Sequence, residues 1–137
     1  MVYYAWKKEE TDRVLDGLRE RSKAGVPIVV EGRRDEAALR KLGITGPVMC
    51  LKAAGESRLR VLEKLDGYGQ VVLLTDFDRE GGELHAWLYQ ELSNLGIRAD
   101  DLLWRKIKAL ARTEVRSVEE LPSFTRSLEA RALGERP

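Results

Sequence analysis

Features that cross-link a protein chain or anchor it in a membrane are nearly absent from this sequence. Its 137 residues include one cysteine, Cys50, which excludes a disulfide framework and a zinc cluster of thiolates. Apolar runs such as Val-Val-Leu-Leu at 71–74 are far shorter than the roughly 20 residues that cross a bilayer. The amino terminus does not read as a signal peptide. These absences predict a cytoplasmic protein that lacks a structural metal and makes no membrane contact.

Amide side chains are also scarce, and neither sign of charge dominates. Few amide, cysteine and methionine residues beside many Arg, Glu and Lys residues form a composition typical of thermophilic proteins. The 24 basic and 23 acidic residues leave a formal net charge of +1. This balance neither supports nor excludes a nucleic-acid partner. The hydrophobic fraction of 43% is sufficient for a single domain with its own core.

Short β-branched runs alternate with helical patterns along the chain. Strands are expected at 28–30, 47–51 and 71–74, with a weaker edge strand around Leu103 and Trp104. Helices are expected at 9–24, 35–42, 56–65, 83–95 and 123–133. Strands that alternate with helices at intervals of about 25 residues predict an α/β fold. Its sheet is expected to be mainly parallel, with about four strands sandwiched between helices.

Two of the expected strands run into acidic residues. The first ends at Glu31, and the third is followed by Asp76 and Asp78, with Glu80 two residues further on. Ligands of parallel α/β sheets bind beyond the carboxyl ends of the strands. Carboxylates gathered there without a cation repel one another, and a bound Mg²⁺ would relieve that repulsion. The alternative is that Asp76 or Asp78 only caps the helix that follows.

The two acidic segments together resemble the Toprim domain. They read Ile-Val-Val-Glu-Gly at 28–32 and Leu-Leu-Thr-Asp-Phe-Asp-Arg-Glu-Gly at 73–81. This domain occurs in type IA and type II topoisomerases, bacterial-type primases, OLD-family nucleases, recombination proteins and the ribonuclease that matures 5S ribosomal RNA. The second segment is especially similar to that of type IA topoisomerases, whereas the spacing of the two segments looks more like that of small stand-alone archaeal Toprim proteins.

The resemblance also implies an organisation for the chain. A Toprim domain is expected at 26–116, between a helical extension at 1–25 and a helical tail at 117–137. All three parts are expected to form one compact unit.

The resemblance further implies a role for each acid. Glu31 corresponds to a glutamate that performs general acid/base work or binds metal, and Asp76 and Asp78 correspond to aspartates that hold Mg²⁺, with Mn²⁺ as an alternative. Glu80 matches a third acid of the topoisomerase-type motif that other branches lack. Phosphoryl transfer needs cations on the transferring phosphate and a group that moves a proton. Strand passage and priming need further domains in this family and are not expected here.

Basic residues near the acidic segments and in one later stretch are candidate contacts for the phosphates of RNA or DNA. They are Arg33, Arg34, Lys52, Arg79, Arg105, Lys106 and Lys108. Arg112 and Arg116 extend the later stretch. Ordinary solvated ion pairs with neighbouring acids are the alternative for each of them. Trp104 is expected either to stack on a base or to be buried under the edge of the sheet.

Three further features have a structural and a functional interpretation. His85 lies on the helix after the acids, where a catalytic base is conceivable and a structural role is more typical. Cys50 is expected to be an inert core residue in a strand. Tyr3, Tyr4 and Trp6 form an apolar patch that would pack on the domain or on a second subunit.

Three functional hypotheses follow. The first is an Mg²⁺-dependent protein that handles nucleic-acid phosphodiesters as an RNA or DNA nuclease. The second is a non-catalytic, metal-dependent nucleic-acid-binding module, as a homo-oligomer or within a larger nucleoprotein assembly. The third is a phosphatase or receiver-like domain built on Asp76 and Asp78. Haloacid-dehalogenase-type phosphatases place such a pair after their first strand, which disfavours the third hypothesis.

Overall fold

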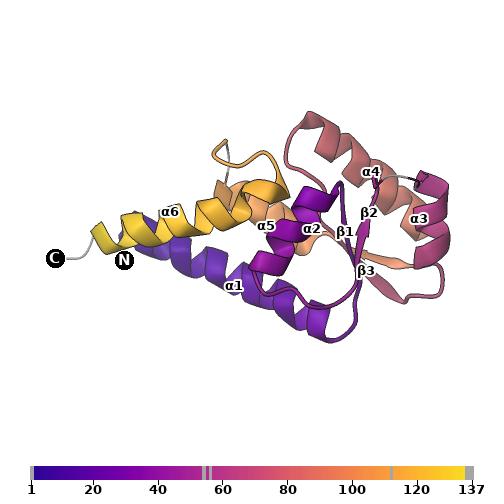
Figure 1. The fold of residues 1–137 in the computed structure, drawn as a ribbon, viewed down its shortest axis with the longest axis horizontal. Coiled ribbons are helices and arrows are strands. Elements are labelled where there is room, and N and C mark those ends of the chain that lie inside the picture. Colours follow the sequence, from indigo (N-terminus) through magenta and orange to yellow (C-terminus); the bar gives the residue numbers. More distant parts are fainter. Residues whose placement is uncertain (1, 54, 56, 112, 135–137) are drawn as a thin grey trace.

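The computed structural model describes residues 2–53, 55, 57–111 and 113–134, in which helices and strands alternate (Figure 1). The strands are β1 (Ile28–Val30), β2 (Val48–Cys50), β3 (Gln70–Leu73) and β4 (Arg98–Asp100). The helices are α1 (Tyr3–Lys23), α2 (Arg33–Lys41), α3 (Arg58–Leu65), α4 (Arg79–Asn94), α5 (Leu102–Ala111), the short 3-10 helix η1 (Val118–Glu120) and α6 (Leu121–Gly134).

The strands form one sheet in the order β2-β1-β3-β4, and every pairing is parallel. Val29 of β1 lies opposite Met49 on one side and Leu73 on the other. Because the strands are parallel, their carboxyl ends lie along one edge of the sheet. The expected α/β fold, with a parallel four-stranded sheet between helices, is confirmed.

Alternate residues of the central strands face the two layers of helices. Val29 and Leu73 pack with the buried residues of α3 and α4. Val30 and Val72 face the opposite way, toward buried residues of α1, α5 and α6. Both faces of the sheet are therefore covered, which explains why its strands read as continuous apolar runs.

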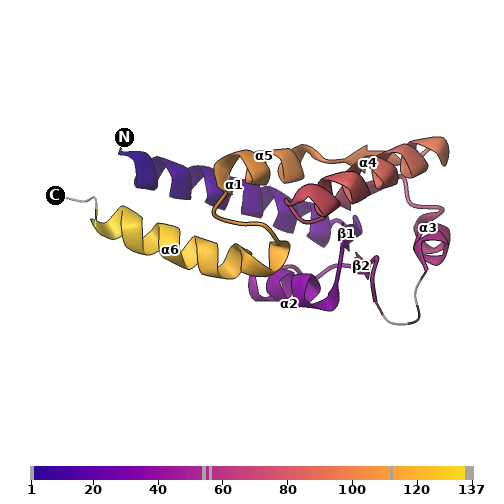
Figure 2. The ribbon, with the colours of Figure 1, turned by 90° about the horizontal axis from the view of Figure 1, so that it is seen from above.

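Helices α1 and α6 lie side by side, and in both views they project away from the strands with the two termini at one end (Figure 1 and Figure 2). α1 begins at Tyr3, earlier than the expected residue 9. The added turns pack against α6, where the Lys7 ammonium lies 5.6 Å from the centroid of the Phe124 ring. Among the described residues, no helix combines the length and the apolar character of a membrane span.

The fourth strand lies earlier in the chain than expected. The edge strand expected at Leu103 and Trp104 is wrong, because both residues lie in α5 and β4 ends at Asp100. Asp100 Oδ1 accepts a hydrogen bond from the Leu102 N–H over 3.1 Å, which favours the turn into the helix. The buried residues of α5 recur at helical spacing and include Leu103, Trp104 and Ile107. This spacing favours a helix more strongly than the two adjacent apolar residues favour a strand.

Other helix boundaries differ from the expected ones by a few residues. α2 begins at Arg33 rather than at residue 35, and α4 begins at Arg79 rather than at residue 83. Two glycines in the first turn of α4 made a later start look favourable from sequence. Residue 56, the expected start of α3, and Arg112 of the later basic stretch lie outside the described residues.

Candidate functional site

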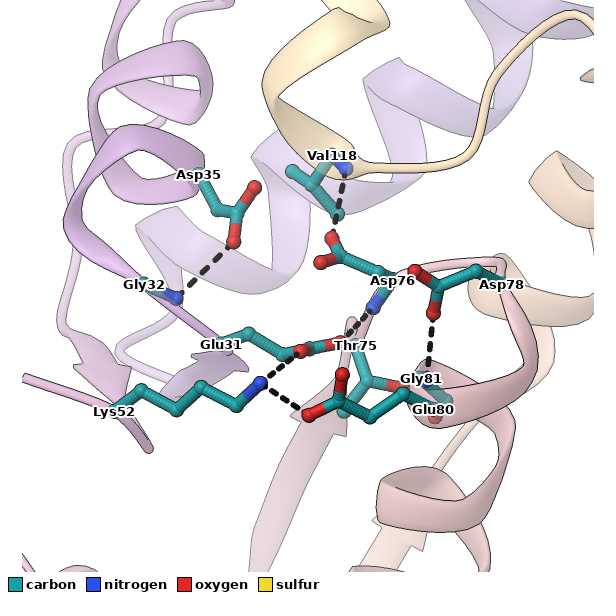
Figure 3. A network of polar contacts seen from close by, with 10 residues as sticks. All are labelled: Glu31, Gly32, Asp35, Lys52, Thr75, Asp76, Asp78, Glu80, Gly81 and Val118. Atoms are coloured by element: carbon teal, nitrogen blue, oxygen red, sulfur yellow. Dashed lines mark hydrogen bonds and ion pairs between the residues drawn. The ribbon is translucent and has the colours of Figure 1, made fainter.

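Adjacent strand ends bring the first two acids together. Glu31 follows β1 and Asp76 follows β3, and these two strands are hydrogen-bonded neighbours. The backbone N–H of Asp76 donates to Glu31 Oε2 over 2.8 Å (Figure 3). Glu31 is only 5% exposed. The buried Glu31 and the half-buried Asp76 therefore lie together at the carboxyl edge of the sheet.

Lys52 connects Glu31 to a third acid. It follows β2 on the other side of β1, and its backbone N–H donates to the Glu31 carbonyl over 2.8 Å. Its ammonium lies 3.2 Å from Glu31 Oε1 and 2.5 Å from Glu80 Oε1, in the first turn of α4. The hydrogen bond to Glu80 raises the pKa of Lys52. The lysine therefore remains charged throughout the neutral range and bridges two elements.

Asp76 is held as a half-buried acid beside other acids. Its Oδ1 accepts a hydrogen bond from the Val118 N–H over 3.1 Å. Burial, with added repulsion from the negative charges of Asp35 and Glu31, raises the pKa of Asp76 to about 7. Among the described residues, no cationic side chain lies in ion-pair contact with Asp76. Its charge is therefore left uncompensated in this arrangement.

Asp35 belongs to the site although sequence reasoning did not select it. Its two oxygens accept hydrogen bonds from the Gly32 N–H over 3.1 Å and from the Glu119 N–H over 3.0 Å. Burial raises the pKa of Asp35. The signal was an acid in the first turn of α2, four residues after Glu31. The hydrogen bond from η1 could not be predicted from the sequence pattern, because it comes from a backbone amide distant in sequence.

Asp78 differs from Asp76 in what its carboxylate does. Asp78 Oδ1 accepts a hydrogen bond from the Gly81 N–H over 2.7 Å and caps α4. Thr75 Oγ1 donates to the Gly81 carbonyl over 2.8 Å. A side chain at residue 81 would collide with the backbone carbonyl of Asp76. One oxygen of Asp78 is therefore used to cap α4, and the close approach of α4 holds Glu80 near the strand ends.

Trp104 supports the loop that carries these acids. Its Nε1–H donates over 2.8 Å to the carbonyl of Thr75, the residue before Asp76. The His85 ring stacks on the indole with centroids 4.0 Å apart, and His85 Nε2 lies 3.0 Å from Asp101 Oδ2. Burial lowers the pKa of His85. These contacts favour the structural interpretation of His85, and they place Trp104 in the interior rather than on the surface.

The basic residues beside the acids are exposed. The side chain of Arg79 is 95% exposed, with its Nε 3.4 Å from Glu83. The side chain of Arg34 is 86% exposed, and its Nη1 is 3.9 Å from Glu119 Oε1, which is long for an ion pair. Arg33 begins α2 and is also exposed. Pairs this open to solvent are weak, so these guanidinium groups are available to an incoming phosphate.

The basic residues of α5 are exposed as well. Arg105 lies 3.3 Å from Asp101, and the Lys108 ammonium lies 4.9 Å from the centroid of the Trp104 ring. Lys106 is exposed on the same helix. Helical spacing spreads these side chains over the outer surface of α5, because its apolar side chains face the core.

A surface hollow of about 340 Å³ adjoins Asp78. Its lining residues are Phe77, Asp78, Arg79, Thr113, Val115 and Arg116. It therefore combines two arginines with an apolar wall, directly beside the acidic segment.

The donor groups of this site fit a hard divalent cation. Among the described residues, no three carboxylate, imidazole or thiol groups converge as an all-protein metal cage would require. Mg²⁺ does not require such a cage, because it usually takes one or two carboxylates and keeps several waters. Burial raises the pKa of Asp76 to about 7, the negative charges of Asp35 and Glu31 add to the shift, and a bound dication would offset those charges. Asp76 and Glu31 therefore fit Mg²⁺ by donor type and by charge.

Comparison with known proteins identifies the family of this chain. The family model described as the Toprim domain matches residues 26–110. The UPF0292 protein of Thermococcus onnurineus is 35% identical over 118 residues, which are 86% of this chain and 85% of that protein. The UPF0292 protein of Methanosarcina acetivorans is 31% identical over 129 residues, which are 93% of this chain and 88% of that protein.

A solved structure of a protein from Aquifex aeolicus is similar in fold. Its TM-score is 0.69 at 27% sequence identity, and the match covers 80% of this chain and 95% of that chain. Toprim domains are usually Mg²⁺-binding modules that handle nucleic-acid phosphodiesters. The chain therefore belongs to the Toprim domain family, and its homologues include the archaeal UPF0292 proteins, which are small stand-alone Toprim proteins.

Proposed function

We propose that this chain is a divalent-metal-dependent nuclease that cleaves phosphodiester bonds of RNA or DNA. The observation that carries the proposal is the environment of Asp76. This half-buried acid lies beside Glu31 and Asp35, and among the described residues it has no cation as an ion-pair partner. A site that concentrates uncompensated negative charge at a strand end is suited to a dication and, through it, to a phosphate.

Each acid has an assigned role in this proposal. Glu31, Asp76, Asp78 and Glu80 would hold Mg²⁺ or Mn²⁺. When bound, the cation supplies positive charge that stabilises the transferring phosphate. Glu31 Oε1 faces the half-exposed Lys52 ammonium, whereas Glu31 Oε2 is occupied by the Asp76 N–H. Glu31 is also the residue to which we assign the proton transfer of the reaction.

Exposed cations around the acids would bind the nucleic-acid backbone. Arg33, Arg34 and Arg79 lie nearest to the acidic segments in the chain, and the hollow beside Asp78 adds Arg116. Lys52 and the basic residues of α5, Arg105, Lys106 and Lys108, would extend the contact. Phosphate contacts of this kind supply affinity that falls steeply with salt and carry little sequence information.

The test is cleavage of labelled structured RNA, single-stranded DNA and supercoiled plasmid in Mg²⁺ or Mn²⁺. The wild-type protein is compared with Glu31→Gln and with an Asp76→Asn, Asp78→Asn double variant. Metal-dependent cleavage by the wild type is expected, with a rate at least about 100-fold lower in both variants, because proton transfer and charge stabilisation are lost. The exposed Glu63 of α3 provides the control variant Glu63→Gln, which should cleave at the wild-type rate.

One observation favours a second candidate, a non-catalytic nucleic-acid-binding module. Both carboxylate oxygens of Glu31 already have a partner, the Asp76 N–H and the Lys52 ammonium. A glutamate so engaged can organise a binding surface without moving a proton. Folded protein that binds RNA or DNA in a metal-dependent way, but cleaves no better than the variants, would favour this module over the nuclease.

A further inference from the structure

A cation already lies between two of the carboxylates assigned to the metal. The Lys52 ammonium contacts Glu31 Oε1 at 3.2 Å and Glu80 Oε1 at 2.5 Å (Figure 3). Within the described part of the chain, Lys52 is the one cationic side chain in ion-pair contact with either acid. Glu31 follows β1 and Glu80 lies in α4, so the ammonium holds together two groups that would otherwise repel.

The backbone of Lys52 is fixed, whereas its side chain can leave. Its N–H donates to the Glu31 carbonyl over 2.8 Å, which anchors the residue beside β1. Its side chain is 46% exposed, and the Glu80 side chain is 63% exposed. A lysine has a flexible four-carbon stem and a strongly hydrated ammonium. Movement of the ammonium into solvent therefore leaves no buried, unpaired charge on Lys52 itself.

An ammonium and a hard dication compete for the same oxygens. Both prefer carboxylate oxygen, and a dication interacts twice as strongly with a carboxylate at equal distance. Glu31 is 93% buried in its side chain, so it cannot be neutralised by solvent ions as an exposed acid can. Either cation would therefore offset the negative charge of Glu31.

We propose that Lys52 is the resident counter-ion of this site without metal, and that a divalent cation displaces its ammonium from Glu31 and Glu80 on binding. This inference rests on the proposed function, because it takes the metal site of Glu31 and Asp76 as given. The inference also predicts the order in which Lys52 acts as a counter-ion and as a phosphate contact. While Lys52 bridges the acids it is not free for a phosphate, so metal binding precedes any contact of Lys52 with nucleic acid.

The test measures binding of the metal alone by titration calorimetry with MgCl₂ and MnCl₂ at constant salt. Lys52→Gln is expected to bind the metal roughly tenfold more tightly than the wild type, because the competing charge is gone. Lys23→Gln is the matched control, since Lys23 is exposed at the end of α1 that precedes β1, at the opposite edge of the sheet. The control should bind as the wild type does. Equal or weaker binding by folded Lys52→Gln overturns the inference.

A measurement on the unmodified protein avoids dependence on the variant's folding. The lysine side-chain ammonium signals are followed by ¹H–¹⁵N NMR during an MgCl₂ titration, with the Lys52 signal assigned by its absence in Lys52→Arg. Movement of this signal to the position of free lysine as the metal saturates supports displacement. A Lys52 signal that stays unchanged while metal binds overturns it.

An Asp76→Asn variant separates this inference from the proposed function. Metal binding by the wild type that weakens in Asp76→Asn, without tighter binding in Lys52→Gln, overturns the displacement and leaves the metal site in place. Absence of metal binding in the wild type and in every variant overturns both.

Discussion

Two aspartates separated by one residue have different surroundings in this protein. Asp78 turns its carboxylate to the N–H of Gly81 and caps α4. Asp76 instead lies half-buried against Glu31, with a hydrogen bond from Val118. The difference follows from position, because Asp78 begins a helix while Asp76 is the residue at which the buried strand segment ends. Burial near other acids, and not residue type, makes Asp76 the unusual carboxylate.

The raised pKa of Asp76 gives a prediction for stability against pH. In the unfolded chain an aspartate loses its proton near pH 4, whereas folded Asp76 holds it until about pH 7. The stability that Asp76 contributes is therefore complete below about pH 4 and is lost as the pH rises through 7. Without metal, the free energy of unfolding of Asp76→Asn relative to the wild type should increase between pH 4.5 and pH 8. Urea denaturation at several pH values measures this difference.

Comparison with the variant removes the contribution of titrating groups that do not interact with Asp76. Asp35 has a raised pKa and His85 a lowered one, both mainly through burial, and they are present in both proteins. The effect of His85 cancels in the difference, whereas that of Asp35 remains in part because the negative charge of Asp35 acts on Asp76. MgCl₂ at pH 8 should stabilise the wild type more than Asp76→Asn. Wild-type and variant curves that run parallel from pH 4.5 to pH 8 would contradict the prediction.

At the level of secondary structure, the start of α4 depends on Gly81. The absence of a side chain there permits close packing, and no left-handed backbone angle is involved. Gly81 lies in the first turn of the helix, directly against the backbone of Asp76. The Thr75 hydroxyl and the Asp78 carboxylate both bond to Gly81. The loop after β3 and the first turn of α4 therefore form one unit, which places Glu80 within reach of Lys52.

Replacement of Gly81 by alanine should disrupt this unit. The added methyl group would collide with the backbone carbonyl of Asp76, which cannot move without displacing the acid. We expect a loss of about 2 to 4 kcal/mol in the free energy of unfolding, measured by urea denaturation, together with weaker metal binding.

The neighbouring glycine provides the control. Gly82 lies in the same helix, and among the described residues a methyl group there would meet no atom within 4 Å apart from its chain neighbours and the backbone of its own helix. Gly82→Ala should stabilise the protein by about 0.5 to 1 kcal/mol, because alanine favours the helix. Similar losses in both variants would show that helix propensity, and not the approach to Asp76, governs this turn.

At the scale of the whole molecule, the two chain ends complete the domain. Val14 and Leu18 of α1 share one buried cluster with Phe124 and Leu128 of α6 and with Val30 of the sheet. Backbone N–H groups of η1 donate to Asp76 and Asp35. The helices outside residues 26–110, the range that matches the family model, therefore cover one face of the sheet and contact the site.

A fragment limited to residues 26–116 should not fold cooperatively. It would lack α1 and α6 and expose the cluster on that face of the sheet to water. Far-ultraviolet circular dichroism during urea titration is expected to show no cooperative transition for the fragment and a single transition for the full chain. A fragment that unfolds cooperatively and binds Mg²⁺ like the full chain would refute this dependence.

The sequence predicted the elements that repeat a short-range pattern. The strands around 28–30 and 71–74 appear where β-branched and apolar runs lie between glycine-rich turns, because a strand buried on both faces must be apolar throughout. The same pattern failed at Leu103 and Trp104. A pair of apolar residues is compatible with a strand or with a helix, and only packing against the rest of the core resolved it as α5.

For the candidate site, the residue pattern along the chain indicates which acids follow the strands. Glu31 and Asp76 follow β1 and β3, and pairing of these parallel strands makes them neighbours. The packing of the folded chain adds Asp35 to this pair, lets Lys52 bridge Glu31 and Glu80, and brings the η1 amides to the acids. Strand ends are set by local pattern along the chain. Contacts between residues far apart in sequence are set by how the helices pack on the sheet, and no local pattern records that packing.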